Sequence, residues 1–250
     1  MEAKPLIHIH DLIAETWRDY KKNWNEMLRI SAWLVVGPAF YFLCMLLAQL
    51  VPAILGAMSV VGTSISFVVT LWAMVRIMLW TLAKNRGDQL PKNESRLAGA
   101  MLLAFFWIAL LNGLAVLGGF ILFVLPGIWL TINFKFCSYA FLEDGKRGTQ
   151  ALAASAALVK GRWWAIFWRI ILPDLLFFIL YVAVVSVMTA AIGAIAGLSR
   201  LDILMTAQPT TANPLVFAIR DLMQGVGQML FLPIFILIEV KMFHLLKKSR

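Results

Sequence analysis

The sequence predicts an all-α, polytopic membrane protein that forms a single domain over residues 1–250. Hydrophobic residues make up 62% of the chain and charged residues 14%, whereas about a quarter of the residues in an ordinary soluble domain are charged. The polar stretches between the apolar runs reach no more than about thirty residues, too few to bury a core of their own. Six transmembrane helices and two interfacial amphipathic helices account for this pattern.

The first predicted element is an amphipathic helix over 6–28. Apolar side chains recur there at spacings of three and four, with charged residues between them. Tryptophans and mixed charges suit a helix that lies at the cytoplasmic surface of the membrane. The alternative is that the same apolar stripe packs against a neighbouring helix of this protein. The stripe consists of Leu6, Ile9, Ile13, Trp17, Tyr20, Trp24 and Met27.

Six spans come next, with a second predicted interfacial helix over 149–160 between the fourth and the fifth. The fourth span is shorter than the usual ~20 residues, so the third and fourth either cross the membrane fully or form a re-entrant hairpin. The fifth would extend ~50 Å at 1.5 Å per residue, and we expect a break near Pro173. The approximate limits of the six spans are 30–51, 58–83, 97–123, 127–142, 164–198 and 222–246.

Basic residues gather on one side of these spans. Most of the 22 Lys and Arg residues precede the first span, separate the second from the third, follow the fourth or close the chain, whereas Arg200 and Arg220 lie on the other side. The positive-inside rule then places both termini in the cytoplasm. The net charge of +9 therefore reflects membrane topology, and no nucleic-acid partner is predicted.

No arrangement of residues in the sequence points to catalysis. The three histidines and two cysteines lack a metal-ligand spacing, and no phosphate-binding loop, nucleophile elbow or dinucleotide motif is present. We therefore expect a non-enzymatic protein that uses neither a metal ion nor a cofactor.

Four charged residues lie inside the predicted spans. Counted along the helices from the cytoplasmic ends, Arg76, Lys135 and Glu239 are about 11 Å deep and Asp174 about 15 Å. Because an isolated charge in hydrocarbon is costly, these residues are candidates for a polar site in the cytoplasmic half of the membrane. The alternative is that they pair with one another for helix assembly, or that Arg76 and Lys135 extend to the surface.

A second candidate site is the basic edge around the helix predicted over 149–160. Cations near a membrane surface attract anionic lipid, and tryptophan favours the interface. The alternative is that these charges mark topology alone. The candidate head-group contacts are Lys146, Arg147, Lys160, Arg162 and Trp163.

Two stretches of similar order indicate a parallel internal repeat. Residues 15–30 and 154–169 both carry an amphipathic helix, a basic residue, tryptophan and the start of a span, which pairs Lys21 with Lys160 and Trp24 with Trp163. Chance similarity between apolar sequences is the alternative.

One segment carries a family resemblance. From Pro126 to Trp164 the order is "LPGIWL", an apolar helix, "FLEDGKRGTQALAAS" and "LVKGRWW". This order resembles the YciC-type bacterial inner-membrane proteins and the related membrane domain of some glycerophosphoryl diester phosphodiesterases. The resemblance implies a six-span protein of the bacterial inner (plasma) membrane, without the catalytic chemistry of the separate phosphodiesterase domain. The motif positions are Pro126, Gly127, Ile128, Gly145, Ser155 and Gly161.

The sequence as a whole thus predicts a non-enzymatic inner-membrane protein that interacts with lipids or takes part in envelope assembly. Membrane lipids are the expected partners, together with further copies of this chain or other membrane proteins. The rival hypothesis is a small-solute transporter, or a membrane subunit of one, with its polar site in the cytoplasmic half.

Overall fold

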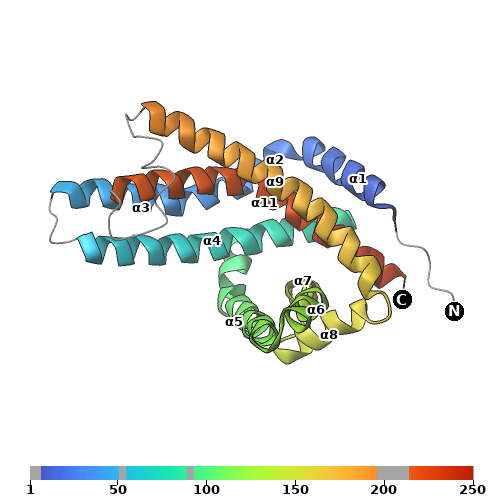
Figure 1. Ribbon diagram of the computed structural model, residues 1–250. Helices are drawn as coiled ribbons and strands as arrows, with labels where there is room; N and C mark the ends of the chain where they lie inside the picture. Colours follow the sequence, from blue (N-terminus) through green and yellow to red (C-terminus); the bar gives the residue numbers. More distant parts are fainter. Residues whose placement is uncertain (1–6, 51–54, 89–92, 196–213, 250) are drawn as a thin grey trace. The chain divides into compact units, whose positions relative to one another are not determined.

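The computed structural model describes residues 7–50, 55–88, 93–195 and 214–249. These residues form helices joined by short turns, with no strand among them, so the all-α prediction is confirmed. Figure 1 shows their course. The helices are α1 (Ile9–Lys22), α2 (Trp24–Ser31), α3 (Trp33–Leu50), α4 (Leu55–Arg86), α5 (Glu94–Leu122), α6 (Val124–Phe134), α7 (Cys137–Asp144), α8 (Thr149–Val159), α9 (Trp163–Ile195) and α11 (Pro214–Lys248).

Five helical stretches of the described chain are long and apolar enough to cross a membrane, one fewer than the six spans predicted. The predicted span 127–142 is divided between two helices. Helix α6 ends just before Lys135 and α7 begins just after it, at Cys137. At 1.5 Å per residue these helices are about 17 and 12 Å long, against a hydrocarbon core of about 30 Å. The five stretches are Trp24–Leu47, Gly56–Arg86, Glu94–Leu122, Trp163–Ala194 and Ala218–Lys248.

The predicted break near Pro173 is wrong, because α9 is continuous from Trp163 to Ile195. Proline also lies inside α3 and α11, at Pro38 and Pro233. A proline removes one backbone hydrogen bond, and membrane helices accommodate that loss through neighbouring groups and small local adjustments. A helix of 33 residues exceeds the thickness of the hydrocarbon core, so it must tilt or extend beyond it.

The chain divides into two compact units, and α4, α9 and α11 each contribute to both. Unit 1 holds α1, α5, α6, α7 and α8 with one end of each shared helix. Unit 2 holds α2 and α3 with the remainder of the shared helices. Unit 1 comprises Met1–Lys22, Val75–Leu175 and Ile234–Arg250, and unit 2 comprises Asn23–Met74 and Leu176–Pro233.

The predicted helix over 6–28 is found as two helices, α1 and α2, divided at Asn23. Helix α1 packs within unit 1 on the end of α11, where the ammonium nitrogen of Lys241 lies 2.6 Å from Asp19 and 3.5 Å from Glu15. This packing agrees with the alternative interpretation of the apolar stripe. The buried side chains of α1 are Leu12, Thr16 and Tyr20.

Helices α5, α6, α7 and α8 pack together in unit 1, as Figure 1 shows. The turn between α5 and α6 is at Phe123, whose backbone is extended. Gly119 and Gly127 let the two helices approach closely, because a Cβ on Gly127 would lie 2.4 Å from the ring of Phe120. The helix predicted over 149–160 is α8, and it packs on α6 and α7 through Ala151, Leu152, Ser155 and Val159.

Unit 2 is also packed through glycines. A Cβ on Gly37 of α3 would lie 2.6 Å from the backbone of Ser66 in α4, and a Cβ on Gly225 of α11 would lie 2.8 Å from the ring of Pro38. Small residues allow membrane helices to approach closely. Helix α3 is therefore in direct contact with both α4 and α11 within this unit.

The internal repeat stays a prediction. In both proposed copies a new helix begins at the paired tryptophan, which is Trp24 for α2 and Trp163 for α9. The turns differ, because Gly161 has a φ of +80° before α9 whereas Asn23 has a φ of −109° before α2.

Candidate functional site

The break between α6 and α7 is held by Ser155 of α8. Its hydroxyl donates to the carbonyl oxygen of Asn133 at 2.6 Å and accepts from the backbone N–H of Phe136 at 3.0 Å. Both backbone groups would lack partners inside an apolar region, since a helix end leaves its terminal N–H and C=O groups unpaired. The side chain of Ser155 is fully buried. Ser155 therefore stabilises the break between α6 and α7, where Lys135 lies.

Lys135 lies at the centre of a charged cluster in unit 1. Its ammonium nitrogen is 2.7 Å from Glu239 Oε1 on α11 and 3.6 Å from Asp174 Oδ2 on α9. The hydroxyl of Tyr139 on α7 donates to the second oxygen of Glu239 at 2.7 Å. The three charged side chains are between 14% and 27% exposed, so solvent reaches the cluster only partly.

Arg76 is not part of this cluster. Its guanidinium group lies 2.7 Å from Glu94, the first residue of α5. Equal depth along the helices was an insufficient criterion here, because depth does not specify which face of a helix a side chain occupies. The structure thus brings together Lys135, Asp174 and Glu239 of the four predicted residues, and it adds Tyr139, which sequence reasoning missed.

One carboxylate oxygen of Asp174 accepts no hydrogen bond from the described residues. Its Oδ1 atom is buried and has no partner among the described residues, although Oδ2 faces Lys135. A buried acceptor without a donor costs about 1–3 kcal/mol. The cluster can therefore accept one further hydrogen bond from water or from a bound molecule.

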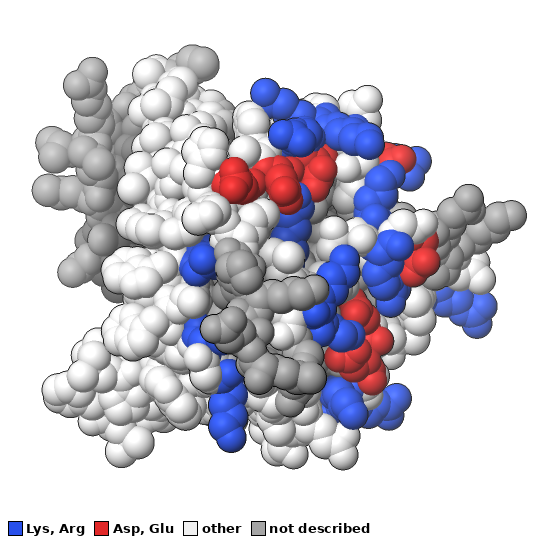
Figure 2. Space-filling model, turned by 90° about the vertical axis from the view of Figure 1, so that its right-hand side faces the viewer, with Lys and Arg blue, Asp and Glu red and all other residues white. Residues whose placement is uncertain are grey.

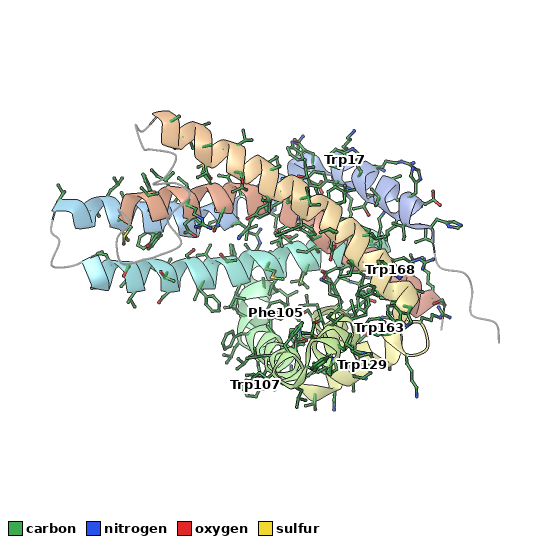
Figure 3. All side chains as sticks on the ribbon, viewed as in Figure 1. Trp17, Phe105, Trp107, Trp129, Trp163 and Trp168 are labelled. Carbon is green, nitrogen blue, oxygen red and sulfur yellow. The ribbon has the colours of Figure 1, made fainter. Side chains whose placement is uncertain are left out.

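A groove of about 620 Å³ opens between α6 and α9 in unit 1. Trp129 and Trp163 meet there, as Figure 3 shows, and the indole N–H of Trp163 donates to the carbonyl oxygen of Trp129 at 3.3 Å. Trp163 stacks on Phe167 with ring centroids 5.1 Å apart. The groove is lined by Leu125, Pro126, Ile128, Trp129, Trp163, Trp164 and Phe167.

Basic side chains lie at both ends of α8, the helix that precedes α9 in the chain. Lys146 and Arg147 lie before α8 and Lys160 ends it; all three are exposed and form no ion pair within the described chain. Arg162 differs, because it donates to the hydroxyl and carbonyl oxygens of Ser249. Figure 2 shows Lys and Arg side chains together with Asp and Glu side chains on the face that it views. The predicted head-group contacts thus include three cations that are open to a ligand.

The motif positions of the resemblance have structural roles in this part of the chain. Pro126 and Ile128 line the groove, and Gly127 allows the close approach of α5 and α6. Gly145 ends α7 with a φ of +66°, and Gly161 adopts a φ of +80° before α9. Only glycine takes such positive φ values without strain. These residues determine where the helices stop and turn.

A further polar cluster was not predicted from the sequence. His244 Nε2 lies 2.6 Å from Glu143 Oε2, and the other ring nitrogen contacts the amide of Asn85. Lys247 lies 2.7 Å from Glu143 and 2.6 Å from Asp144. Burial acts to raise the pKa of Glu143, but the hydrogen bonds and charges of Lys247 and His244 outweigh it and lower the pKa. The sequence signal was the pair of acids at the end of α7 opposite two basic residues near the end of α11.

These features define the class of protein as a helical membrane protein, with an apolar groove and a buried charged cluster in one unit. No protein-family model, curated protein or solved structure matches this chain. The resemblance carried by residues 126–164 therefore stays a prediction, and the function of the protein has to be inferred from its own geometry.

Proposed function

We propose that this protein is a non-enzymatic component of a bacterial inner membrane, with both termini in the cytoplasm, and that it binds an anionic phospholipid. The observation that carries the proposal is the aromatic groove between α6 and α9 together with the cations at both ends of α8. One acyl chain would lie in the groove and the head group would face Lys146, Arg147 or Lys160.

The energetics favour this combination of groups. Each methylene group that an acyl chain buries contributes about 0.8 kcal/mol, although a lipid already dissolved in the bilayer gains only the difference between the two environments. Selectivity therefore depends on the head group, where each basic residue near the surface contributes about 1 kcal/mol toward an anionic lipid. Tryptophan suits such a boundary because its ring is apolar and its N–H is polar.

Native mass spectrometry of the full-length protein tests the proposal. We expect the wild type to retain phosphatidylglycerol in preference to phosphatidylethanolamine. The K146Q/R147Q/K160Q variant should lose that preference by about a hundredfold, because three favourable charges of about 1 kcal/mol each are removed from the site. The matched control R18Q/K22Q/K248Q removes three exposed charges from α1 and the end of α11, and it should bind like the wild type. An equal loss of lipid preference in both variants would show that only the net charge matters, and it would refute a defined binding site.

The same spectra report the number of copies of the chain, which addresses the proposed envelope-assembly role. They also address small-solute transport, the second candidate function. The unpartnered Oδ1 atom of Asp174 favours this candidate, because a solute donor would satisfy it. A retained solute that disappears in Asp174→Asn would support transport through the charged cluster.

A further inference from the structure

Unit 2 contains a polar cavity of about 520 Å³ between α3, α4 and α11. All three helices belong to the stretches that are long and apolar enough to cross a membrane. Polar groups are uncommon in such helices and usually face one another or water. The lining residues with polar side chains are Tyr41, Thr63, Ser66, Thr70, Arg220, Asp221, Gln224 and Gln228.

The polar residues form one stripe on each of two facing helices. Thr63, Ser66 and Thr70 recur at spacings of three and four along α4, and the stripe on α11 has the same spacings, with Asp221, Gln224 and Gln228. Residues at these spacings share one face of a helix. Within the described chain no side chain of these six residues forms a hydrogen bond or an ion pair. The stripes therefore face the cavity with their polar groups available.

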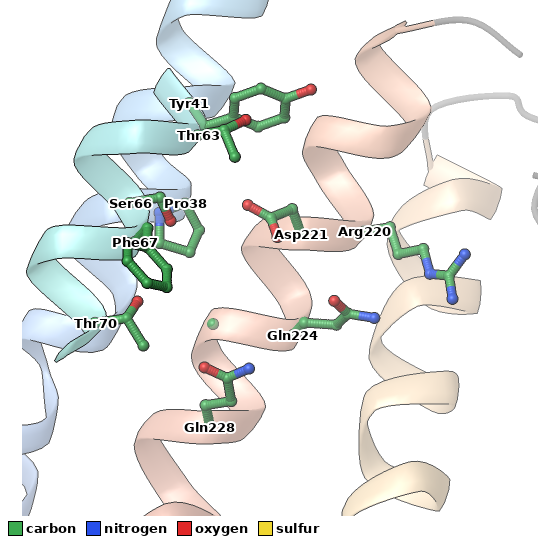
Figure 4. Close-up of a pocket in the computed structure, with 11 residues that line it drawn as sticks. Pro38, Tyr41, Thr63, Ser66, Phe67, Thr70, Arg220, Asp221, Gln224 and Gln228 are labelled. Atoms are coloured by element: carbon green, nitrogen blue, oxygen red, sulfur yellow. The ribbon is translucent and has the colours of Figure 1, made fainter. Parts of the chain in front are cut away.

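Asp221 gives the cavity its charge. It is the sole carboxylate among the described lining residues, and Figure 4 shows it pointing from α11 toward α4. The neighbouring Arg220 points away from the cavity centre in the same view. The interior thus presents one negative group, two amides and several hydroxyls. Asp221 has no ion-pair partner among the residues that the structure describes, and such a charge in a membrane-spanning helix indicates a binding role, since a purely structural charge is normally paired.

We propose that this cavity binds a small organic cation that carries an ammonium group and a hydroxyl. The carboxylate of Asp221 would pair with the ammonium group, and the rings of Tyr41 and Phe67 in the lining add cation–π attraction. The amides of Gln224 and Gln228 and the hydroxyl of Thr70 would bond the hydroxyl of the ligand. The volume is within the range of small-molecule sites. This inference does not depend on the lipid groove, which lies in unit 1.

Choline is a suitable probe, with the full-length protein in nanodiscs of phosphatidylglycerol. We expect choline chloride to bind saturably by calorimetry against sodium chloride of equal ionic strength, and glycerol not to bind. Asp221→Asn should weaken choline binding at least tenfold, because it keeps the shape of the side chain and removes its charge. Asp11→Asn is the matched control, because it makes the same substitution at an exposed carboxylate of α1 that does not line the cavity, and it should leave binding within twofold of the wild type.

Tyr41→Leu provides a second test that changes no charge in the membrane, and we expect it to weaken choline binding about threefold through loss of the ring face. Nanodiscs that contain phosphatidylethanolamine distinguish the source of the ligand. If that lipid competes with choline, the natural ligand is a lipid head group. If the choline affinity is unchanged, the natural ligand is a free solute. Both results support a cation-binding site in this cavity. Absence of choline binding by the wild type, or equal binding by folded Asp221→Asn, would overturn the proposal.

Discussion

The acidic residues of the two units differ in their partners. In unit 1 Glu239 accepts from both Lys135 and Tyr139, so its two oxygens are satisfied. In unit 2 Asp221 lies in the same helix, α11, and has no hydrogen-bond or ion-pair partner among the described residues. A paired charge mainly holds helices together, whereas an unpaired one is retained for a ligand. The comparison separates an assembly site from a binding site on one helix.

The largest effect on stability should come from a substitution in the paired site of unit 1, which consists of Lys135, Asp174 and Glu239. Glu239→Gln removes the negative charge that faces Lys135 and leaves that lysine with Asp174 alone. Removal of one partner from a buried ion pair costs about 3–5 kcal/mol, and we expect the low end because Lys135 is partly exposed. Thermal unfolding in detergent measures this loss.

The matched substitution in the other unit sharpens the comparison. Asp221→Asn should leave the unfolding temperature unchanged or raise it, because no partner loses its charge. The triple variant K135L/D174L/E239L should recover much of the stability lost in Glu239→Gln, since apolar residues often replace a complete buried charge cluster with little penalty. Equal destabilisation by Glu239→Gln and Asp221→Asn would contradict the assignment of different roles.

A smaller loss is expected from Ser155→Ala, which tests whether the paired site depends on the α6–α7 break. The backbone N–H of Phe136 would lose its acceptor, and an unsatisfied buried group costs about 1–3 kcal/mol. Thr149→Ala is the control, because Thr149 is an exposed residue in the first turn of the same helix. Equal stability of the two variants would show that Ser155 does not hold the break.

The sequence predicted the helices better than it predicted the polar sites. Apolar runs and periodicity were sufficient for five of the six predicted spans, but the division of 127–142 depends on Ser155, a residue of another helix. Depth along the helices placed Lys135, Asp174 and Glu239 together and failed for Arg76, whose partner lies at the start of α5. Distances along an axis carry no information about rotation around it.

The cavity of unit 2 was missed for a different reason. Ser and Thr in apolar helices commonly bond to a backbone carbonyl one turn earlier, as Ser31 and Thr81 do here. Thr63, Ser66 and Thr70 therefore carry no signal as single residues. The signal is the matching spacing of the stripes on α4 and α11, and recognising it requires knowing that these helices are neighbours.

The smallest effect tests Glu143 of unit 1, which lies outside the five stretches that are long and apolar enough to cross a membrane. Because the folded protein lowers the pKa of Glu143, its ionised form contributes stability at pH values above the ordinary glutamate pKa of 4.5. That contribution is lost as the pH falls through the lowered pKa, where Glu143 becomes protonated and its bonds to Lys247 and His244 weaken. Unfolding temperatures measured from pH 7 down to pH 3 should therefore fall less steeply for Glu143→Gln than for the wild type, from a lower starting value. Parallel curves for the two proteins would mean that Glu143 contributes nothing to the acid sensitivity, and that the ion pairs of this cluster are too exposed to act as the paired charges around Lys135 do.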